Sequence, residues 1–273
     1  MPIVDLIIST RNDNDSALIN TLHSIDKSNF LDFRVLLVND SNKIIPDNIL
    51  VNSLVEVVVI DNHESLGLTY SLIFAISYSN AKYIARADVG DILHPARIEE
   101  QVNYMESNPL CVVLGCSTRI WVKSHKRNLI DAGSSFYSKN SKEIKKMLLK
   151  TNPFVHGSIM IRASAYQESG GYDGNVKVAQ DFNLYIRMAP LGELAILQRV
   201  LSQHTFDLSN STTFVKNKKS IFSALKSRLK YFSLKDKLSK FFIYGVLRDL
   251  ILLMLPLKVL FKLRVYLITR NKV

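Results

Sequence analysis

The sequence predicts an α/β protein built on a doubly wound parallel sheet. Short apolar runs rich in β-branched residues, typical of buried parallel strands, alternate with segments of helical periodicity over roughly the first 115 residues. The chain has 273 residues, of which 47% are hydrophobic and 22% charged, so it can bury a large core. This composition excludes a disordered, collagen-like or disulfide-stapled protein.

The expected strands and helices follow one another with short connections. Leu18, Leu22 and Ile25 fall at helical spacing behind polar residues at 12–14 that could cap a helix. Pro95 would open a later helix, because proline suits the first helical turn. The expected strands are 3–9, 33–38, 55–60 and 82–87, with a further helix over 66–78.

Each of these four strands is followed by carboxylate or amide side chains. The carboxyl ends of parallel strands meet at one edge of a sheet, where ligands bind in a crevice. Asn and Asp are also common in turns and caps, so one such residue alone carries little weight, but four successive strand ends favour a binding site. The residues are Thr10, Arg11 and Asn12, then Asn39 and Asp40, then Asp61 and Asn62, and finally Asp88 and Asp91.

Charge is distributed unevenly along the chain. The formal net charge is +11, but residues 216–273 carry a net +13 and residues 1–215 a net −2. A uniformly basic protein would suggest nucleic acid as a partner. A basic tail rich in Leu, Ile and Phe suggests an anionic membrane surface instead. We therefore expect no nucleic-acid partner and two parts, a domain over 1–215 and a membrane-associating helical tail over 216–273.

The tail has the pattern of a basic amphipathic helix, which predicts that it lies on a membrane. Arg248 and Asp249 divide the apolar residues 241–257, and placing this ion pair in mid-bilayer would cost on the order of several kcal/mol. Surface association is therefore favoured over spanning. The alternative is a tail packed on the domain or in a dimer. The predicted apolar face consists of Ile221, Leu225, Leu229 and Phe232.

The first residues and the cysteines both favour a cytoplasmic protein. The start, MPIVD, lacks the basic region and apolar run of a secretory signal. Cys111 and Cys116 have no metal-ligand spacing, which suggests a reducing compartment and no structural zinc. With the basic tail, these features predict a peripheral protein on the inner face of the plasma membrane.

Six ordered blocks of sequence resemble one family of enzymes. The first three are VDLIISTRND, FRVLLVNDSN and NHESLGLTYSLIFAISYSNAKYIARADVGD. The later three are HPARIEEQVNYMESNP, NPFVHGSIMIRASAYQESGGYD and VAQDFNLYIRMAPLGELAILQRVLSQH. Their order and spacing, from Val4 to about His204, resemble the inverting family-2 glycosyltransferases, which are nucleotide-sugar enzymes with the GT-A fold.

The resemblance implies a Rossmann-like mixed sheet of the GT-A type and a sugar-transfer reaction. The expected donor is a UDP-sugar, and the sugar would pass with inversion to a hydroxyl of a lipid-linked saccharide or polysaccharide. Cell-surface polysaccharide biosynthesis is the expected setting. Mn²⁺ or Mg²⁺ would neutralise the departing diphosphate.

The resemblance also assigns roles to single residues. Asp181 would be the general base that takes the proton of the acceptor. Asp40 would accept a hydrogen bond from a uracil-like N–H, and Asp88 and Asp91 would hold the metal ion. The donor site would consist of Thr10, Arg11, Asn12, Asp40, Asn62, Asp88 and His156. Weaker expectations are that Arg187 pairs with helix carboxylates and that His204 contacts the diphosphate. Trp121 and Tyr172 would stack on a sugar or pack in the core.

Three positions depart from the family pattern. The usual Asp-x-Asp metal motif reads DVGD here, so Gly90 stands at the second Asp. Gln180 replaces the Glu of a Glu-Asp pair, which would lower the pKa of the base relative to that pair, and Asn39 replaces the first Asp of another pair. A catalytically silent sugar-nucleotide-binding or scaffold protein therefore stays open, although a silent relative has no need to keep Asp181. A nucleotidyltransferase would need a Gly-rich phosphate loop, which STRND lacks.

Overall fold

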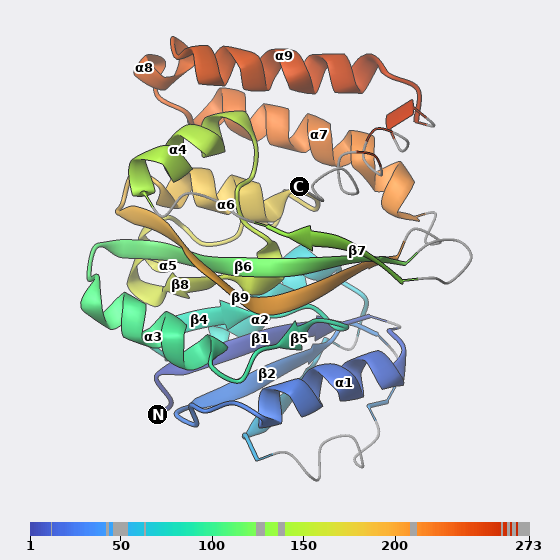
Figure 1. The fold of residues 1–273 in the computed structure, drawn as a ribbon, viewed down its shortest axis with the longest axis vertical. Coiled ribbons are helices and arrows are strands. Elements are labelled where there is room, and N and C mark those ends of the chain that lie inside the picture. The colour runs from blue at the N-terminus through green and yellow to red at the C-terminus, as the bar shows by residue number, and fades with distance from the viewer. Residues whose placement is uncertain are drawn as a thin grey trace.

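In the described part of the chain, a mixed sheet of nine strands runs through the middle of the protein (Figure 1). In this computed structural model the strand order is β3-β2-β1-β4-β8-β6-β9-β5, and β7 pairs with β6. The strands are β1 (Val4–Thr10), β2 (Phe33–Asn39), β3 (Val57–Asp61), β4 (Tyr83–Arg86), β5 (Ile92–Leu93), β6 (Cys111–Lys123), β7 (Leu129–Ser134), β8 (Met160–Arg162) and β9 (Glu193–Asp207). The structure describes all residues except 12, 42–43, 46–53, 63, 124–128, 136–139, 208–211, 258, 261–262, 264–265 and 267–273, and only the backbone of 207 and 212–217.

The first four strands form the parallel half of the sheet. β2 and β4 both pair in parallel with β1, and β3 pairs in parallel with β2. These are the four strands that the sequence predicts, shifted by no more than two residues, so that prediction is confirmed. In β1, Leu6 and Ile8 pack on one face and Ile7 on the other, and all three are at most 1% exposed. This burial on both faces explains why the strand reads as an unbroken apolar run.

The second half of the sheet is mixed. β8 is antiparallel to both β4 and β6, β6 and β9 run parallel, and β5 is antiparallel to β9. β9 thereby returns the chain to the side of the loop that follows β4. The mixed sheet is the kind of architecture that the resemblance implies.

Helices cover both faces of the sheet (Figure 1). α1 and α3 pack against one face, and α2, α4, α5 and α6 against the other. The side-chain oxygen of Asn14 accepts a hydrogen bond at the start of α1, so one of the predicted caps is confirmed. The helix expected from Pro95 begins at Arg97. The helices are α1 (Asp15–Asp26), α2 (Leu68–Ser77), α3 (Arg97–Ser107), α4 (Ser141–Lys150), α5 (Ala163–Glu168), α6 (Gln180–Met188), α7 (Thr212–Tyr231), α8 (Leu234–Lys237) and α9 (Lys240–Met254).

Helices α7 and α9 form an outer layer beyond α4 and α6 (Figure 1). α7 packs against α6 and α9, and α9 also packs against α4. The fully buried Arg228 of α7 lies where these helices meet. Its Nε lies 3.4 Å from Asp249 of α9, and its guanidinium donates to the carbonyl oxygens of Leu149 and Lys150 at the end of α4. A cation is favoured at a helix C-terminus, so Arg228 joins three helices.

The apolar face that the sequence predicts on α7 lies partly inside the protein. Leu225 is 7% exposed and Ile221 and Phe232 are partly buried, whereas Leu229 is 48% exposed. This face therefore packs partly on the domain, the alternative that the sequence leaves open, and membrane association of the tail stays a prediction. Within the described part of the chain, no helix combines the length and hydropathy required to cross a bilayer.

Candidate active site

A cavity of about 1310 Å³ opens where β1, β2 and β4 end. Thr10 and Asn62 lie in its surroundings, 7% and 9% exposed, but do not line it. Asn12 lies outside the described residues. The predicted site residues that line the cavity are Arg11, Asp40, Asp88, His156 and Asp181.

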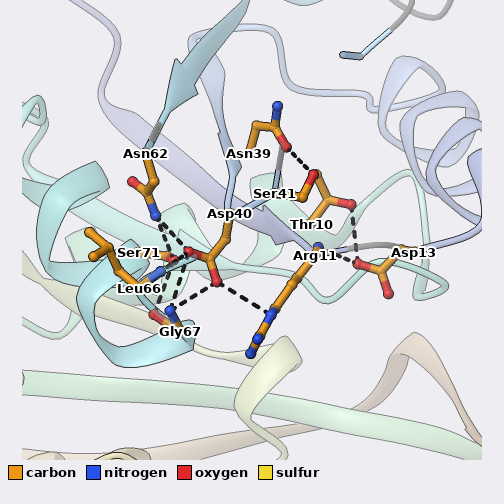
Figure 2. Close-up of polar contacts among 10 residues, drawn as sticks. All are labelled: Thr10, Arg11, Asp13, Asn39, Asp40, Ser41, Asn62, Leu66, Gly67 and Ser71. Atoms are coloured by element: carbon orange, nitrogen blue, oxygen red, sulfur yellow. Dashed lines mark hydrogen bonds and ion pairs between the residues drawn. The ribbon is translucent and has the colours of Figure 1, made fainter. Parts of the chain in front are cut away.

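Asp40 anchors the loop that leads into α2 (Figure 2). Its carboxylate, 1% exposed, accepts hydrogen bonds from the Leu66 N–H at 2.7 Å, the Gly67 N–H at 2.9 Å and the Asn62 amide at 3.0 Å. The Nε of Arg11 lies 4.0 Å from its Oδ2. Asp40 therefore shapes the cavity wall. A uracil-like N–H would have to share Oδ2, which is possible because each carboxylate oxygen accepts more than one hydrogen bond.

The turn after β1 is held by the carboxylate of Asp13. Thr10 Oγ1 and the Arg11 N–H both donate to Asp13 Oδ2, at 3.1 and 2.8 Å (Figure 2). The Arg11 side chain is left 58% exposed at the cavity. The turn thus presents a cation to the cavity while its backbone is fixed.

Asn39 pairs with a carboxylate on the neighbouring strand. Its Nδ2 donates to Asp61 Oδ1 at 2.7 Å, where β2 and β3 end in register. Its Oδ1 accepts from Ser41 Oγ at 2.8 Å (Figure 2). An aspartate at position 39 would face the carboxylate of Asp61, so the amide accounts for this departure from the family pattern.

Asp88 is held by a buried arginine. Arg86, the last residue of β4, donates through Nη2 to Asp88 Oδ1 at 2.6 Å, and the Arg86 side chain is 4% exposed. Partial burial acts to raise the pKa of Asp88, but the charge and hydrogen bond of Arg86 outweigh it and hold that pKa below its ordinary value. Asp88 is therefore a carboxylate anion at neutral pH.

Asp91 is fixed between two elements. Its Oδ1 lies 2.6 Å from Nδ1 of His204 on β9, and its Oδ2 accepts from the Asp88 N–H at 3.0 Å. Burial acts to lower the pKa of His204, but the hydrogen bond and charge of Asp91 raise it above the ordinary value. His204 therefore lies at the site, and its hydrogen-bond partner in the structure is Asp91.

Asp88, Asp91 and His204 offer a possible metal site. Their ligand atoms all lie within 4.8 Å of one another. Two carboxylates and one imidazole suit Mn²⁺, whereas Mg²⁺ prefers oxygen ligands. Gly90 has no side chain to bind a metal, and its φ of 93° is one that L side chains rarely adopt; Asp91 offers the second carboxylate. The residues present therefore fit a divalent ion of the Mn²⁺ type.

Asp181 lies in the first turn of α6 and faces the cavity. Asn152 Nδ2 donates to its Oδ2 at 2.7 Å. Burial raises the pKa of Asp181 above its ordinary value, against the opposing hydrogen bonds of backbone N–H groups and Asn152 and the charge of Arg86. Gln180 beside it is 7% exposed, so a Glu there would have put a second charge in this buried turn.

The remaining candidates divide between cavity and scaffold. His156 lines the cavity, its Nε2 lies 2.8 Å from the Tyr172 hydroxyl, and burial lowers its pKa well below the ordinary value, so it is neutral. Tyr172 is 7% exposed and does not line this cavity, nor does Trp121, whose indole donates to Gln203. Arg187 donates to backbone carbonyls and an amide, not to helix carboxylates as expected.

Two residues at the site were not identified from the sequence. Arg86 carries a signal in hindsight, because a charged residue ends an otherwise apolar buried strand, YIAR, and a buried cation requires a partner. Asn152 carries none, because its contact with Asp181 spans 29 residues of sequence.

Comparison with known proteins identifies the family of the chain. Residues 5–170 match glycosyl transferase family 2. The chain is 28% identical over 213 residues to the amylovoran biosynthesis glycosyltransferase AmsE of Erwinia amylovora, covering 76% of each chain. It is 28% identical over 194 residues to an uncharacterised glycosyltransferase of Methanocaldococcus jannaschii, covering 68% of this chain and 64% of that relative.

Two solved structures share the fold. Residues 1–349 of S. aureus TarS in complex with UDP-GlcNAc give a TM-score of 0.67 at 12% identity, covering 90% of this chain and 72% of that one. Mannosyltransferase PcManGT from Pyrobaculum calidifontis in complex with GDP-Man and Mn²⁺ gives 0.67 at 11% identity, covering 96% and 72%. These likenesses confirm the predicted GT-A type of fold. The family match covers more than half of the chain, and the protein is therefore a glycosyltransferase that belongs to glycosyl transferase family 2.

Proposed function

We propose that the protein transfers a sugar from a UDP-sugar to a hydroxyl of a saccharide acceptor, with inversion at the anomeric carbon. The observation that carries this proposal is that Asp181, a carboxylate with a raised pKa, lines the same cavity as Asp88 and Arg11. Inversion requires a base beside the acceptor hydroxyl and a charge-stabilised leaving group on the opposite side. One cavity that offers both kinds of group supports a direct displacement.

The residues of the cavity divide the work. Asp181 takes the acceptor proton, and Asn152 orients its carboxylate. Bound Mn²⁺ would supply positive charge to the departing diphosphate, held by Asp88, Asp91 and His204. Arg11 is exposed at the cavity and can contact the same diphosphate. The neutral His156 can donate a hydrogen bond to the donor sugar, or accept one from it, without adding charge.

The donor and acceptor classes rest on the relatives. TarS in complex with UDP-GlcNAc supports a UDP-sugar as donor. AmsE is a glycosyltransferase of amylovoran biosynthesis, which supports a lipid-linked saccharide or a growing polysaccharide as acceptor. We accordingly place the reaction in cell-surface polysaccharide biosynthesis.

The outward face of α9 supports peripheral association with the inner face of the plasma membrane. It carries an exposed apolar stripe. Beside the stripe, the Nζ atoms of Lys150 on α4 and of Lys240 lie 4.5 and 5.6 Å from the centre of the Phe241 ring. Residues 216–273 carry a net +13, which complements an anionic surface. The stripe consists of Ile243, Leu247, Leu250, Ile251 and Met254, which are 45–84% exposed.

A panel of UDP-sugars with Mn²⁺ tests the proposal, with hydrolysed and transferred sugar measured by mass spectrometry. We expect Asp181→Asn to lose transfer by at least about 1,000-fold and to retain UDP binding, since a base acts only in the transition state. Asp173→Asn, which changes a carboxylate outside the cavity lining, is the matched control. Transfer by Asp181→Asn within tenfold of wild type would place the base elsewhere. Wild-type protein that binds UDP but transfers and hydrolyses nothing would indicate a silent binding protein.

A further inference from the structure

Part of the cavity lining, here called its apolar end, comes from the C-terminal helices and not from the catalytic residues. Its wall there is built by α7, α9, Leu260 and Leu263. All of these lie outside residues 5–170, the part that matches the family. The apolar lining side chains are Ile221, Ala224, Leu252, Leu260 and Leu263.

The apolar end of the cavity carries no net negative charge. Asp249, the acidic residue there, is neutralised by Arg228 at 3.4 Å and Arg248 at 2.5 Å. Lys177 and Lys219 also line the cavity, and both are exposed. The tail side of the cavity thus combines hydrocarbon with positive charge.

The size of the cavity leaves room for a second ligand. Its volume of about 1310 Å³ exceeds the roughly 300–1,000 Å³ of most small-molecule pockets. A nucleotide-sugar is polar along its whole length, so contacts with five aliphatic side chains would contribute little to its binding. An amphiphile with an anionic group matches both the aliphatic wall and the lysines.

We infer that the apolar end binds the hydrocarbon chain of an acceptor lipid, a sugar phosphate or diphosphate ester of a long-chain alcohol. Its phosphate faces Lys177 and Lys219, and its sugar hydroxyl reaches Asp181. This inference rests on the proposed glycosyl transfer and assigns the acceptor site. In the reaction the acceptor oxygen bonds to the anomeric carbon, the bond from that carbon to the diphosphate breaks, UDP leaves with the electron pair, and Asp181 receives the proton.

Calorimetric titration of the full chain with dodecyl phosphate, below its micelle concentration and without vesicles, tests the site. Methyl phosphate supplies the anion alone, and dodecyl maltoside supplies the chain with a neutral head. We expect dodecyl phosphate to bind at least tenfold more tightly than either. Equal binding of methyl phosphate would reduce the site to an anion site, and equal binding of dodecyl maltoside would show detergent adsorption. Either result overturns the inference.

Variants locate the binding. Leu252→Asp should weaken dodecyl phosphate binding at least tenfold and leave UDP binding within twofold, and Lys219→Glu should weaken it as well. Leu238→Asp is the matched control, because Leu238 is 80% exposed and does not line the cavity. Should Leu252→Asp lower the Tm, Ile221→Asp makes the same test on α7. If the folded variants bind dodecyl phosphate as tightly as wild type, the acceptor site is overturned. If the wild-type protein does not bind UDP, the proposed function is overturned instead.

Discussion

The Arg86 guanidinium lies 2.6 Å from the Asp88 carboxylate, and Arg86 is 3% exposed. A buried cation at the end of a strand thus holds the first residue of the metal motif. Burial raises the pKa of Asp181, and the charge of Arg86 opposes that rise. Nε and Nη1 of Arg86 have no hydrogen-bond partner among the described residues, which costs stability. The value of Arg86 therefore lies in the positive potential that it sets beneath two carboxylates.

Replacing Arg86 by methionine should remove this potential while keeping most of the volume. We expect kcat/KM for transfer to fall by more than about 100-fold, because Asp88 loses its counter-ion and the pKa of Asp181 rises further. Arg86→Lys should recover part of the activity, since it restores the charge. Equal kcat/KM losses in both variants would show that the fork geometry of arginine, rather than its charge, is what matters.

The pH profile of transfer should report the raised pKa of Asp181. A base acts when deprotonated, so kcat/KM should rise with pH through that pKa, which lies above the ordinary value of 3.8. Asn152→Ala removes a hydrogen bond to the ionised form, so its acid limb should move to higher pH while the plateau changes less. If wild type and Asn152→Ala have their acid limbs at the same pH, the profile does not report the ionisation of Asp181.

Gly157 should tolerate no side chain. A Cβ there would overlap with Asp91 Oδ2 and lie 3.2 Å from Asp88 Oδ2. Both groups are tethered, so we expect Gly157→Ala to weaken Mn²⁺-dependent activity about 100-fold and to cost roughly 1–3 kcal/mol in unfolding free energy. Gly174→Ala is the control, because the atoms nearest to its Cβ would belong to Tyr70, which is 42% exposed and can move. Mn²⁺ titration and urea denaturation of both variants make the comparison.

The ion pair between Arg228 and Asp249 should be costly to break from one side. Both residues are at most 1% exposed, so Asp249→Leu leaves a buried guanidinium with less compensation and should cost about 3–5 kcal/mol of unfolding free energy. The double variant Arg228→Met, Asp249→Leu should cost less than the sum of the two single changes. Lys226→Met, on the exposed side of α7, controls for charge loss. If the losses of unfolding free energy measured by urea denaturation are additive in the double-mutant cycle, Arg228 and Asp249 are not coupled.

Vesicle flotation should separate the two faces of the tail. Leu247→Asp and Ile251→Asp on the outward face of α9 should reduce binding to phosphatidylglycerol vesicles at least about tenfold, since they remove buried apolar contact and add repulsion. Leu110→Asp, also at an exposed leucine, lies outside the tail and should float like wild type. Salt should weaken binding without abolishing it. Variants of α9 that float as well as wild type would exclude this face.

The parallel half of the sheet was predictable because each strand is a continuous apolar run buried on both faces. β9 was not assigned, because its 15 residues include Gln198, Arg199 and Gln203 and follow no single period. Its pairing with β6 joins segments about 80 residues apart, and a local pattern carries no information on such a contact. The mixed arrangement came from the family resemblance alone.

The candidate site shows the same division. Strand ends located Asp40 and Asp88, because parallel topology dictates a shared edge. The partners that set their electrostatics, such as Arg86 beneath Asp88 and His204 beside Asp91, depend on tertiary approach. On α7 the helical period was correct, but the period could not decide between its two possible environments, since an apolar stripe packs equally well on a protein or a bilayer.

The clamp that Arg228 makes between α4, α7 and α9 limits how far this enzyme can be treated as modular. Its guanidinium also lies 5.0 Å from the ring of Phe182, the residue after Asp181, and Ser227 beside it accepts from Asn183 at 3.0 Å. A chimaera that joins residues 216–273 to another catalytic domain would carry a cation without its carbonyl acceptors. A swap of the catalytic domain would leave the helix of the base without its support. Exchange of tails between relatives should therefore succeed only when the α4 and α6 surfaces travel with them.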